Sequence, residues 1–362
     1  MTPTVEPQLR AADHIIDHLV VRERVDVFFG LPGGAISPLD DSLHARNDVR
    51  IVTVRHEADA VFAAAGYARA TGKVGVALVT SGPGVLNALN ALASAHLEGL
   101  PVLVLAGEAP RARAGQGSLQ DGSAHGLDIL HVARSMTKMV AELIDPNVAL
   151  PRVMAVLQAM KEGRPGAGLI TCPIDVTAAR APRPHVGLSG YRPAIIDEES
   201  LDRAAALLRD AKRPVIYAGN GVRAGDGPQA LRALAERLQV PVITTPHGKG
   251  VFPESHPLAL GIFGLALHPS AVEFLDEGFD CILAVGTSLS ELSTGGWSKK
   301  LKGPMIQIDI DSSRVGRAFP VDVAVIGPAS AALRSIANRL EPRSPKVFGI
   351  RRNSNPEAFP IG

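Results

Sequence analysis

Two short stretches of the sequence contain residue types that could bind and activate a heterocyclic ligand. His56-Glu57 follows the apolar run 50–54, and Thr80-Ser81-Gly82-Pro83-Gly84 follows a second apolar run, with Asn87 one helical turn further on. A buried carboxyl group at Glu57 could pass a proton to and from a ring nitrogen. A glycine-proline turn can present the free amides of a helix N-terminus to a polar ligand. Together the two stretches predict proton transfer to a bound heterocycle.

Each stretch also has a simpler structural interpretation. An acid in the first helical turn stabilises the helix dipole without any chemistry, and glycine turns often serve packing alone. Two other kinds of site do not fit the spacing. A zinc protease needs a second histidine at the position of Ala60, and a nucleophile elbow needs a Gly-x-Ser-x-Gly frame that Ser81 lacks. For the proton-transfer site, we expect Val61 and Phe62 to bury the Glu57 carboxyl.

The elements that position these stretches alternate between strands and helices in the first half of the chain. The pattern predicts helices over 9–22, 38–44, 57–71, 84–97, 127–134 and 147–161, and strands over 25–29, 50–54, 74–79, 102–106, 136–140 and 167–171. Such alternation predicts a parallel sheet with right-handed crossovers. Ligands of these sheets bind outside the carboxyl ends of the strands, which is where both stretches begin.

The second half of the chain repeats this rhythm. It predicts helices over 198–211, 228–238, 269–276 and 328–340, and strands over 214–218, 240–244, 280–285, 304–310 and 322–326. We expect an α/β protein with two doubly wound, mainly parallel-sheet domains, the second of them Rossmann-like. The predicted boundaries are a first domain at 1–180, a proline-rich linker at 181–197, a second domain at 198–341 and a polar tail at 342–362.

Composition excludes several classes of protein. The net charge of +1 gives no electrostatic case for binding nucleic acid or an anionic membrane. The N-terminus lacks the pattern of a secretion signal, and no apolar run reaches the ~18 residues that suggest a membrane span. Cys172 and Cys281 lie in separate apolar runs, as expected for buried, reduced thiols. We therefore expect a cytoplasmic protein.

Two further glycine-rich stretches resemble nucleotide-binding motifs only in part. Gly219-Asn220-Gly221-Val-Arg223-Ala-Gly225 follows a predicted strand, but its spacing differs by one from the dinucleotide fingerprint and no acid ends the next strand. Gly248-Lys249-Gly250 lacks the other residues of a Walker motif. We expect neither to bind a nucleotide.

The ordered set of motifs resembles the acetolactate synthase-like group of thiamine-diphosphate enzymes over nearly the whole chain. The similarity rests on many matches that occur in the same order. They include Phe29-Gly30-Leu-Pro32-Gly33-Gly34-Ala35, Arg55-His56-Glu57-Ala58, Gly66-Tyr67-Ala68-Arg69, Ser81-Gly82-Pro83-Gly84 with Asn87, Gly163-Arg164-Pro165-Gly166, Pro173-Ile-Asp175-Val176, Gly219-Asn-Gly221, Gly248-Lys249-Gly250 and Ile308-Asp309-Ile310-Asp311.

The resemblance implies a pyrimidine-binding domain followed by the family's central domain. It also implies that Glu57 contacts the aminopyrimidine nitrogen, promotes the imino tautomer and helps form the thiazolium ylid. Further cofactor-binding residues implied in this way are Pro32, Gly33, Gly34, Thr80, Gly82, Pro83 and Asn87. Gln120 is implied as a catalytic residue facing the substrate, within a substrate pocket that includes Ala35, Leu119 and His125. Leu119 stands where the family often has Phe.

The resemblance also implies a reaction class. Family members of the pyruvate decarboxylase type usually carry paired histidines in these loops, whereas residues 111–126 hold only His125. This favours carboligation, in which a 2-oxo acid such as pyruvate loses CO₂ and its acyl group is added to a second carbonyl. The alternatives are a 2-oxo acid decarboxylase subunit and a non-catalytic scaffold or regulatory relative.

The greatest departure from the family concerns the cofactor's diphosphate group. Family members bind diphosphate and Mg²⁺ through a third domain with a Gly-Asp-Gly motif and a downstream Asn. Here the only Gly-Asp-Gly, Gly225-Asp226-Gly227, lies within the second domain and lacks that Asn. We therefore expect no metal site in this chain, and expect a separate diphosphate-binding subunit to hold Mg²⁺; a fragment of a longer enzyme is the alternative.

Two further expectations follow from the resemblance. Self-association is expected, because the family's active site lies between domains of different protomers. The stretch Gly286-Thr-Ser-Leu-Ser290-Glu291 departs from the pattern of FAD-containing relatives, so we expect no functional FAD.

Overall fold

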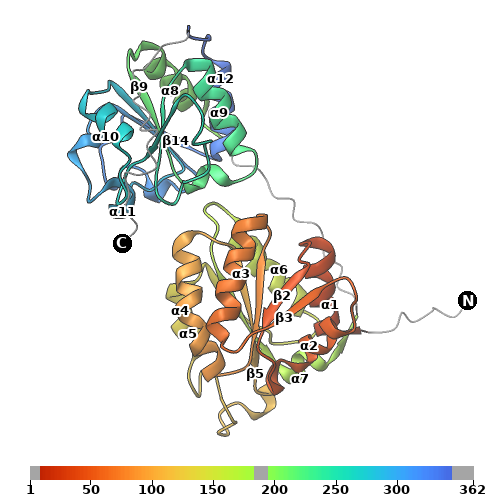
Figure 1. The fold of residues 1–362 in the computed structure, drawn as a ribbon. Helices are drawn as coiled ribbons and strands as arrows, with labels where there is room; N and C mark the ends of the chain where they lie inside the picture. The colour runs from red at the N-terminus through yellow and green to blue at the C-terminus, as the bar shows by residue number, and fades with distance from the viewer. Residues whose placement is uncertain (1–8, 183–194, 345–362) are drawn as a thin grey trace, which may run out of the picture. The chain divides into compact units, whose positions relative to one another are not determined.

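The computed structural model describes residues 9–182 and 195–344. The chain divides into two compact units, Met1–Gly190 and Tyr191–Gly362, each of which is built on its own sheet (Figure 1). The expected linker residues 183–194 and tail residues 345–362 lie outside the described part of the chain.

The first unit is built on a six-stranded sheet in the order β3-β2-β4-β5-β7-β6. All neighbouring strands pair in parallel, as the alternation of helices and strands predicts. The strands are β2 (Val27–Gly30), β3 (Arg50–Thr53), β4 (Gly75–Val79), β5 (Val102–Glu108), β6 (Met139–Glu142) and β7 (Gly168–Pro173).

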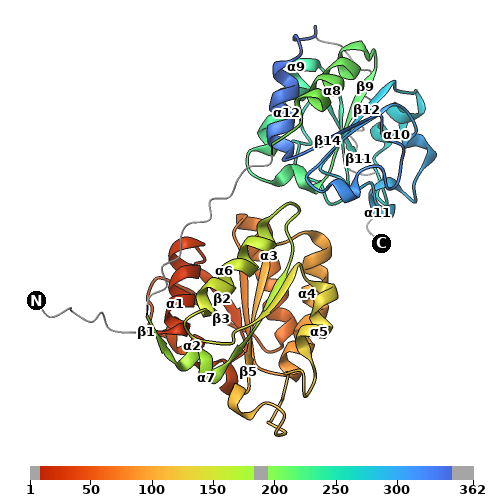
Figure 2. The same cartoon turned by 180° about the vertical axis from the view of Figure 1, so that it is seen from behind.

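Helices cover both faces of this sheet (Figures 1 and 2). Val76 and Leu78 of β4 pack in one hydrophobic core, while Ala77 and Val79 of the same strand pack in another. This alternation is the period-2 geometry of a strand that is buried on both faces. One face carries α1 (Ala11–Asp17), α2 (Ser37–His44), α6 (Ala149–Lys161) and α7 (Ile174–Ala178); the other carries α3 (Glu57–Thr71), α4 (Pro83–Glu98) and α5 (Ile129–Ala133).

Several details of the first unit differ from the sequence-based prediction. The expected helix 9–22 is α-helical only over α1 and continues as a π-helical turn, His18–Arg22. Residues Leu9–Arg10 (β1) instead pair antiparallel with Arg180–Ala181 (β8), so Ala181 pairs with Leu9 although it was expected to begin the linker. Two-residue strands carry no readable alternation, and their pairing depends on contacts between distant parts of the chain.

The second unit has a parallel six-stranded sheet in the order β11-β10-β9-β12-β13-β14. The strands are β9 (Pro214–Ala218), β10 (Val242–Thr244), β11 (Ala259–Ile262), β12 (Cys281–Val285), β13 (Met305–Asp309) and β14 (Val323–Ile326). The edge strand β11 was not predicted, because it is short and contains Gly261 within a loop-rich stretch.

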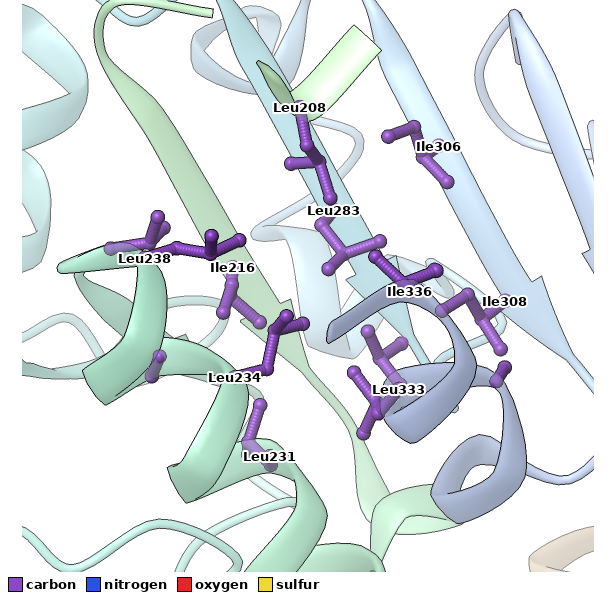
Figure 3. Packing of buried hydrophobic residues seen from close by; sticks show 14 of the residues in the cluster. Leu208, Ile216, Leu231, Leu234, Leu238, Leu283, Ile306, Ile308, Leu333 and Ile336 are labelled. Atoms are coloured by element: carbon purple, nitrogen blue, oxygen red, sulfur yellow. The ribbon is translucent and has the colours of Figure 1, made fainter. Parts of the chain in front are cut away.

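The helices of the second unit also lie on both faces of its sheet. They are α8 (Glu198–Asp210), α9 (Gly227–Leu238), α10 (Pro269–Asp276), α11 (Glu291–Thr294) and α12 (Ala329–Asn338). Figure 3 shows one core, where Leu231 and Leu234 of α9 and Leu333 of α12 pack near Ile216 and Leu283 of the sheet. α10 packs in the core on the opposite face. This arrangement and that of the first unit confirm the predicted fold class.

Both cysteines are buried and free, and burial raises the pKa of the Cys281 thiol to about 12. Among the described helices, none has both the length and the apolar character needed to cross a membrane.

Candidate functional site

The chemistry-bearing loops of the first unit meet at the carboxyl edge of four adjacent strands. β3, β2, β4 and β5 are consecutive in the sheet. Their carboxyl ends lead respectively into Glu57, the Pro32–Ala35 loop, the Thr80–Gly82 turn and Glu108. Because the strands are parallel, all of these segments lie at one edge, where ligands of open α/β sheets bind.

Glu57 is held at this edge as the first residue of α3. His56 is the N-cap of the helix, and its Nδ1 accepts a hydrogen bond from the Ala58 amide at 3.2 Å. The Glu57 side chain is only 7% exposed. Val61 is fully buried as expected, but Phe62 is 48% exposed. The prediction that Phe62 helps to bury Glu57 is therefore wrong, because the helix turns residue 62 towards solvent while Val61 faces the sheet.

Asn87 orients the Glu57 carboxyl from the neighbouring helix. Its Nδ2 donates to Oε2 of Glu57 at 2.9 Å, which joins α3 to α4 across thirty positions of sequence. The second carboxyl oxygen lies beside Gly84, where a Cβ would approach Oε1 to 3.2 Å. The structure therefore brings Glu57 and Asn87, which were both predicted as site residues, into direct contact.

The Thr80–Gly82 turn depends on small residues at two positions. Gly82 has φ +53°, which L side chains rarely adopt, and a Cβ there would lie 2.7 Å from the Gln120 carbonyl oxygen. At Gly33 a Cβ would lie 2.6 Å from Cβ and Oγ1 of Thr80. The predicted cofactor-binding loops thus touch each other, and Pro32, Gly34 and Pro83 lie exposed at the same edge.

The predicted substrate-pocket residues have different environments. The Ala35 backbone packs against β5, since a Cβ on Gly107 would lie 2.6 Å from the Ala35 carbonyl carbon. Gln120 reaches the site through its backbone, beside Gly82, and has a positive φ of 57°. Leu119 is 88% exposed, and His125 is also exposed. Their assignment to a substrate pocket therefore stays a prediction.

Glu108 is a residue at this edge that the sequence analysis did not select. It ends the otherwise apolar strand β5, and it is only 4% exposed. Its Oε1 accepts hydrogen bonds from the amides of Ala109 at 2.8 Å and Gly122 at 3.1 Å. The signal in the sequence is an acid at the end of a fully buried run, a position where an unpaired carboxylate is costly.

The glycines of the second unit have a structural role. A Cβ on Gly219 would lie 2.4 Å from the Gly286 carbonyl oxygen, and the Gly221 amide donates to that oxygen at 2.9 Å. The Gly219–Gly221 loop therefore packs directly on the loop after β12. Asp226 of the Gly-Asp-Gly sequence forms an ion pair with Arg334. Across residues 9–182 and 195–344, no group of three or more His, Cys, Asp or Glu side chains is placed to hold a metal ion.

Comparison with known families gives two matches. Residues 9–128 match the thiamine pyrophosphate enzyme N-terminal TPP binding domain. Residues 201–336 match the thiamine pyrophosphate enzyme central domain. The first match contains Glu57, Asn87 and the loops around them.

Curated relatives include acetolactate synthases from three kinds of organism. The Corynebacterium glutamicum acetolactate synthase large subunit is 36% identical over 314 residues, 85% of this chain and 49% of that protein. A probable large subunit from Methanococcus aeolicus is 36% identical over 328 residues, 88% of this chain and 53% of that protein. The mitochondrial catalytic subunit from Saccharomyces cerevisiae is 32% identical over 351 residues, 91% of this chain and 50% of that protein.

The chain thus spans about half the length of the curated relatives it matches. The domain matches, the relatives and the two parallel-sheet units agree with one another. The chain belongs to the thiamine pyrophosphate enzyme family, in its acetolactate synthase-like group, and carries that family's N-terminal and central domains.

Proposed function

We propose that this chain provides the pyrimidine-binding part of a thiamine-diphosphate-dependent, acetolactate synthase-like enzyme. In the proposed reaction a 2-oxo acid such as pyruvate loses CO₂, and its acyl group is transferred to a second carbonyl compound. The observation that carries the proposal is the buried Glu57 carboxyl, oriented by Asn87 at the carboxyl edge of the sheet.

The residues at this edge fit the pyrimidine end of the cofactor. Gly33 packs closely on Thr80, and Gly84 has no side chain beside Oε1 of Glu57. Pro32, Gly33, Gly34, Thr80, Gly82 and Pro83 would line the heterocycle. When bound, the cofactor supplies the electron sink for loss of CO₂ and acyl transfer.

The chain's own contribution is to place one proton. Asn87 donates a hydrogen bond to Oε2 of Glu57, which keeps the carboxyl group in one orientation. In the proposed mechanism, the other oxygen, Oε1, exchanges a proton with a ring nitrogen of the cofactor. A positioned acid–base group of this kind contributes about 10²- to 10⁴-fold to a reaction rate. Ala60 and Val61, in the first turns of α3 after Glu57, are fully buried.

We also propose that a diphosphate-binding domain outside the described residues completes the site and holds Mg²⁺. A separate subunit is our first choice, and a longer version of this chain is the alternative. The support is the span of about half of each relative. In addition, Leu86 in the first turns of α4, the helix that carries Asn87, is an apolar side chain that is 40% exposed. Self-association, a cytoplasmic location and the lack of FAD remain part of this proposal.

The test is to combine the purified chain with a diphosphate-binding domain of this family, thiamine diphosphate, Mg²⁺ and pyruvate. Formation of a carboligation product such as acetolactate, with release of CO₂, would bear out the proposal. Acetaldehyde as the sole organic product would favour the decarboxylase alternative. A stable complex without turnover would favour the scaffold alternative and would contradict the proposal.

A further inference from the structure

Glu108 links the sheet to the loop that carries Gln120. It lies at the carboxyl end of β5, and its Oε1 accepts from two amides, those of Ala109 and Gly122. Gly122 is therefore tied to the sheet fourteen positions back in sequence. The mechanism proposed above leaves this buried carboxyl without a role.

The other carboxyl oxygen, Oε2, is buried and has no hydrogen-bond partner within the described part of the chain. It faces Gly122, where a Cβ would lie 2.4 Å from Oε2 and 3.0 Å from Cγ1 of Ile129. A negative charge on an oxygen in this apolar contact is costly.

Neighbouring groups add to this cost. Burial raises the pKa of Glu108; the two amides oppose the shift, while the negative charges of Asp121 and Glu142 add to it. Arg111 lies 3.4 Å from Glu142 and partly compensates that charge. The closed loop therefore favours the neutral carboxyl more than solvent does.

The same loop is held at its other side by the Thr80–Gly82 turn. The Gln120 carbonyl oxygen lies against Gly82, and Gln120 has a positive φ of 57°, which is uncommon for a residue other than glycine. The Gly122 carbonyl in turn accepts from the Ile129 amide at 3.0 Å, at the start of α5. Glu108 and Gly82 thus fix the short segment between Gln120 and Gly122 from two sides.

We propose that Glu108 is a positioning residue, which holds the 120–122 segment at the site while its carboxyl is neutral and releases it on ionisation. This inference rests on the proposed function in one respect, the role of Gln120 in the reaction. The hydrogen bond between the Gly122 amide and Glu108 forms within this chain, so it is tested without cofactor or partner.

The experiment measures hydrogen-exchange protection of the Gly122 amide by NMR as a function of pH, corrected for intrinsic exchange. Because the pKa of Glu108 is raised, its neutral form is present at low pH and is lost as pH rises through the folded-state pKa. Protection of Gly122 in the wild type should therefore be highest below the ordinary pKa of a glutamate, fall as pH rises from there to the folded-state pKa, and stay constant above it, because both the closed and the open loop are then ionised.

Two variants make the test specific. In Glu108→Gln, a neutral side chain of the same shape should keep Gly122 protected across the pH range. Glu162→Gln, at an exposed glutamate of the same unit, should show the wild-type profile. If Glu108→Gln is poorly folded, the wild-type titration of the Gly122 amide chemical shift replaces it.

The proposal is overturned in any of three cases. These are identical profiles for wild type and Glu108→Gln, loss of protection in Glu108→Gln already at low pH, and a wild-type Gly122 signal that does not titrate. None of these results depends on turnover, so a failure here is distinguishable from a failure of the proposed function.

Discussion

Glu57 and Asn87 meet because the N-termini of α3 and α4 lie at the same edge of the sheet. Each residue has a simple explanation by itself, as a helix-start acid or a surface amide. Their hydrogen bond changes this, since it fixes a buried carboxyl next to two loops that contain little but glycine, proline and threonine. At the residue scale, proton transfer requires a buried carboxyl group in a fixed orientation, and this pair provides one.

The first prediction concerns Asn87. In the assembled enzyme, Asn87→Ala should lower the rate about tenfold, because a hydrogen bond to a charged group contributes ~1.5–3 kcal/mol and this one is partly screened by solvent. The matched control is Asn90→Ala, an exposed asparagine on the same helix, which should keep the wild-type rate. Steady-state kinetics of the three proteins would decide, and equal rates for the two variants would count against the orienting role.

The second prediction concerns the glycines. Gly82→Ala should destabilise the chain by at least ~1 kcal/mol, because alanine disfavours positive φ and its Cβ would contact the Gln120 carbonyl. Gly66→Ala, within α3 and with open space around the added Cβ, should instead stabilise by ~0.5–1 kcal/mol. Urea unfolding measures both changes. A stable Gly82→Ala variant would show that this turn is not constrained as described.

At the scale of elements, the regular parts of the fold could be predicted from sequence and the local exceptions could not. β4 is an uninterrupted apolar run, β5 is apolar up to its last residue, and α3 begins at the predicted acid. By contrast, the two-residue strands β1 and β8 depend on each other, so neither has a signal of its own.

The same division applies to the candidate site. The sequence predicted Glu57 because it opens the predicted helix 57–71, and Asn87 because it lies one turn into the predicted helix 84–97. It did not predict their mutual contact, since the crossing of α3 and α4 is set by packing. Glu108 was missed because its partner Gly122 lies in a glycine-rich loop without periodicity, and only the folded backbone brings the two together.

The third prediction concerns the exposed surface of α4. Leu86→Asp should weaken association with a diphosphate-binding partner at least ~tenfold, about 1.4 kcal/mol, because Leu86 is an exposed apolar side chain in the first turns of α4 and the proposed partner would cover it. The substitution places an acid near a helix N-terminus, which favours the fold. Analytical ultracentrifugation without cofactor measures the association.

The control for this surface is Leu97→Asp, the same change near the other end of α4, where Leu97 is 70% exposed. It should leave association close to that of the wild type. Wild-type association of the Leu86→Asp protein would place the partner elsewhere.

At the scale of the whole molecule, only the first of the two units contributes residues to the proposed proton-transfer site. The first contains Glu57, Asn87 and the loops around them, whereas the glycine loops of the second pack against each other. The described residues contain no cluster suited to a metal ion, while thiamine diphosphate carries its highest charge on the diphosphate group.

The fourth prediction follows from the presence of a pyrimidine-type site, and the lack of a metal-binding cluster, among the described residues. The purified chain alone should bind thiamine diphosphate weakly, with no gain in affinity from added Mg²⁺. Addition of a diphosphate-binding partner should both tighten binding and make it dependent on Mg²⁺. Isothermal titration calorimetry with and without a chelator makes the comparison, and tight, Mg²⁺-dependent binding by the chain alone would refute the need for a partner.

The central claim is that Glu57 exchanges a proton with the bound cofactor, and isotope exchange tests it most directly. The measurement is proton–deuterium exchange at C2 of the thiazolium ring of bound thiamine diphosphate, in assembled complexes of wild type and Glu57→Gln. Glutamine preserves the size of the side chain but cannot take up and return a proton. The account predicts at least ~10²-fold slower exchange in the variant, with folding and partner binding retained. Equally fast exchange in both complexes would show that Glu57 only starts a helix.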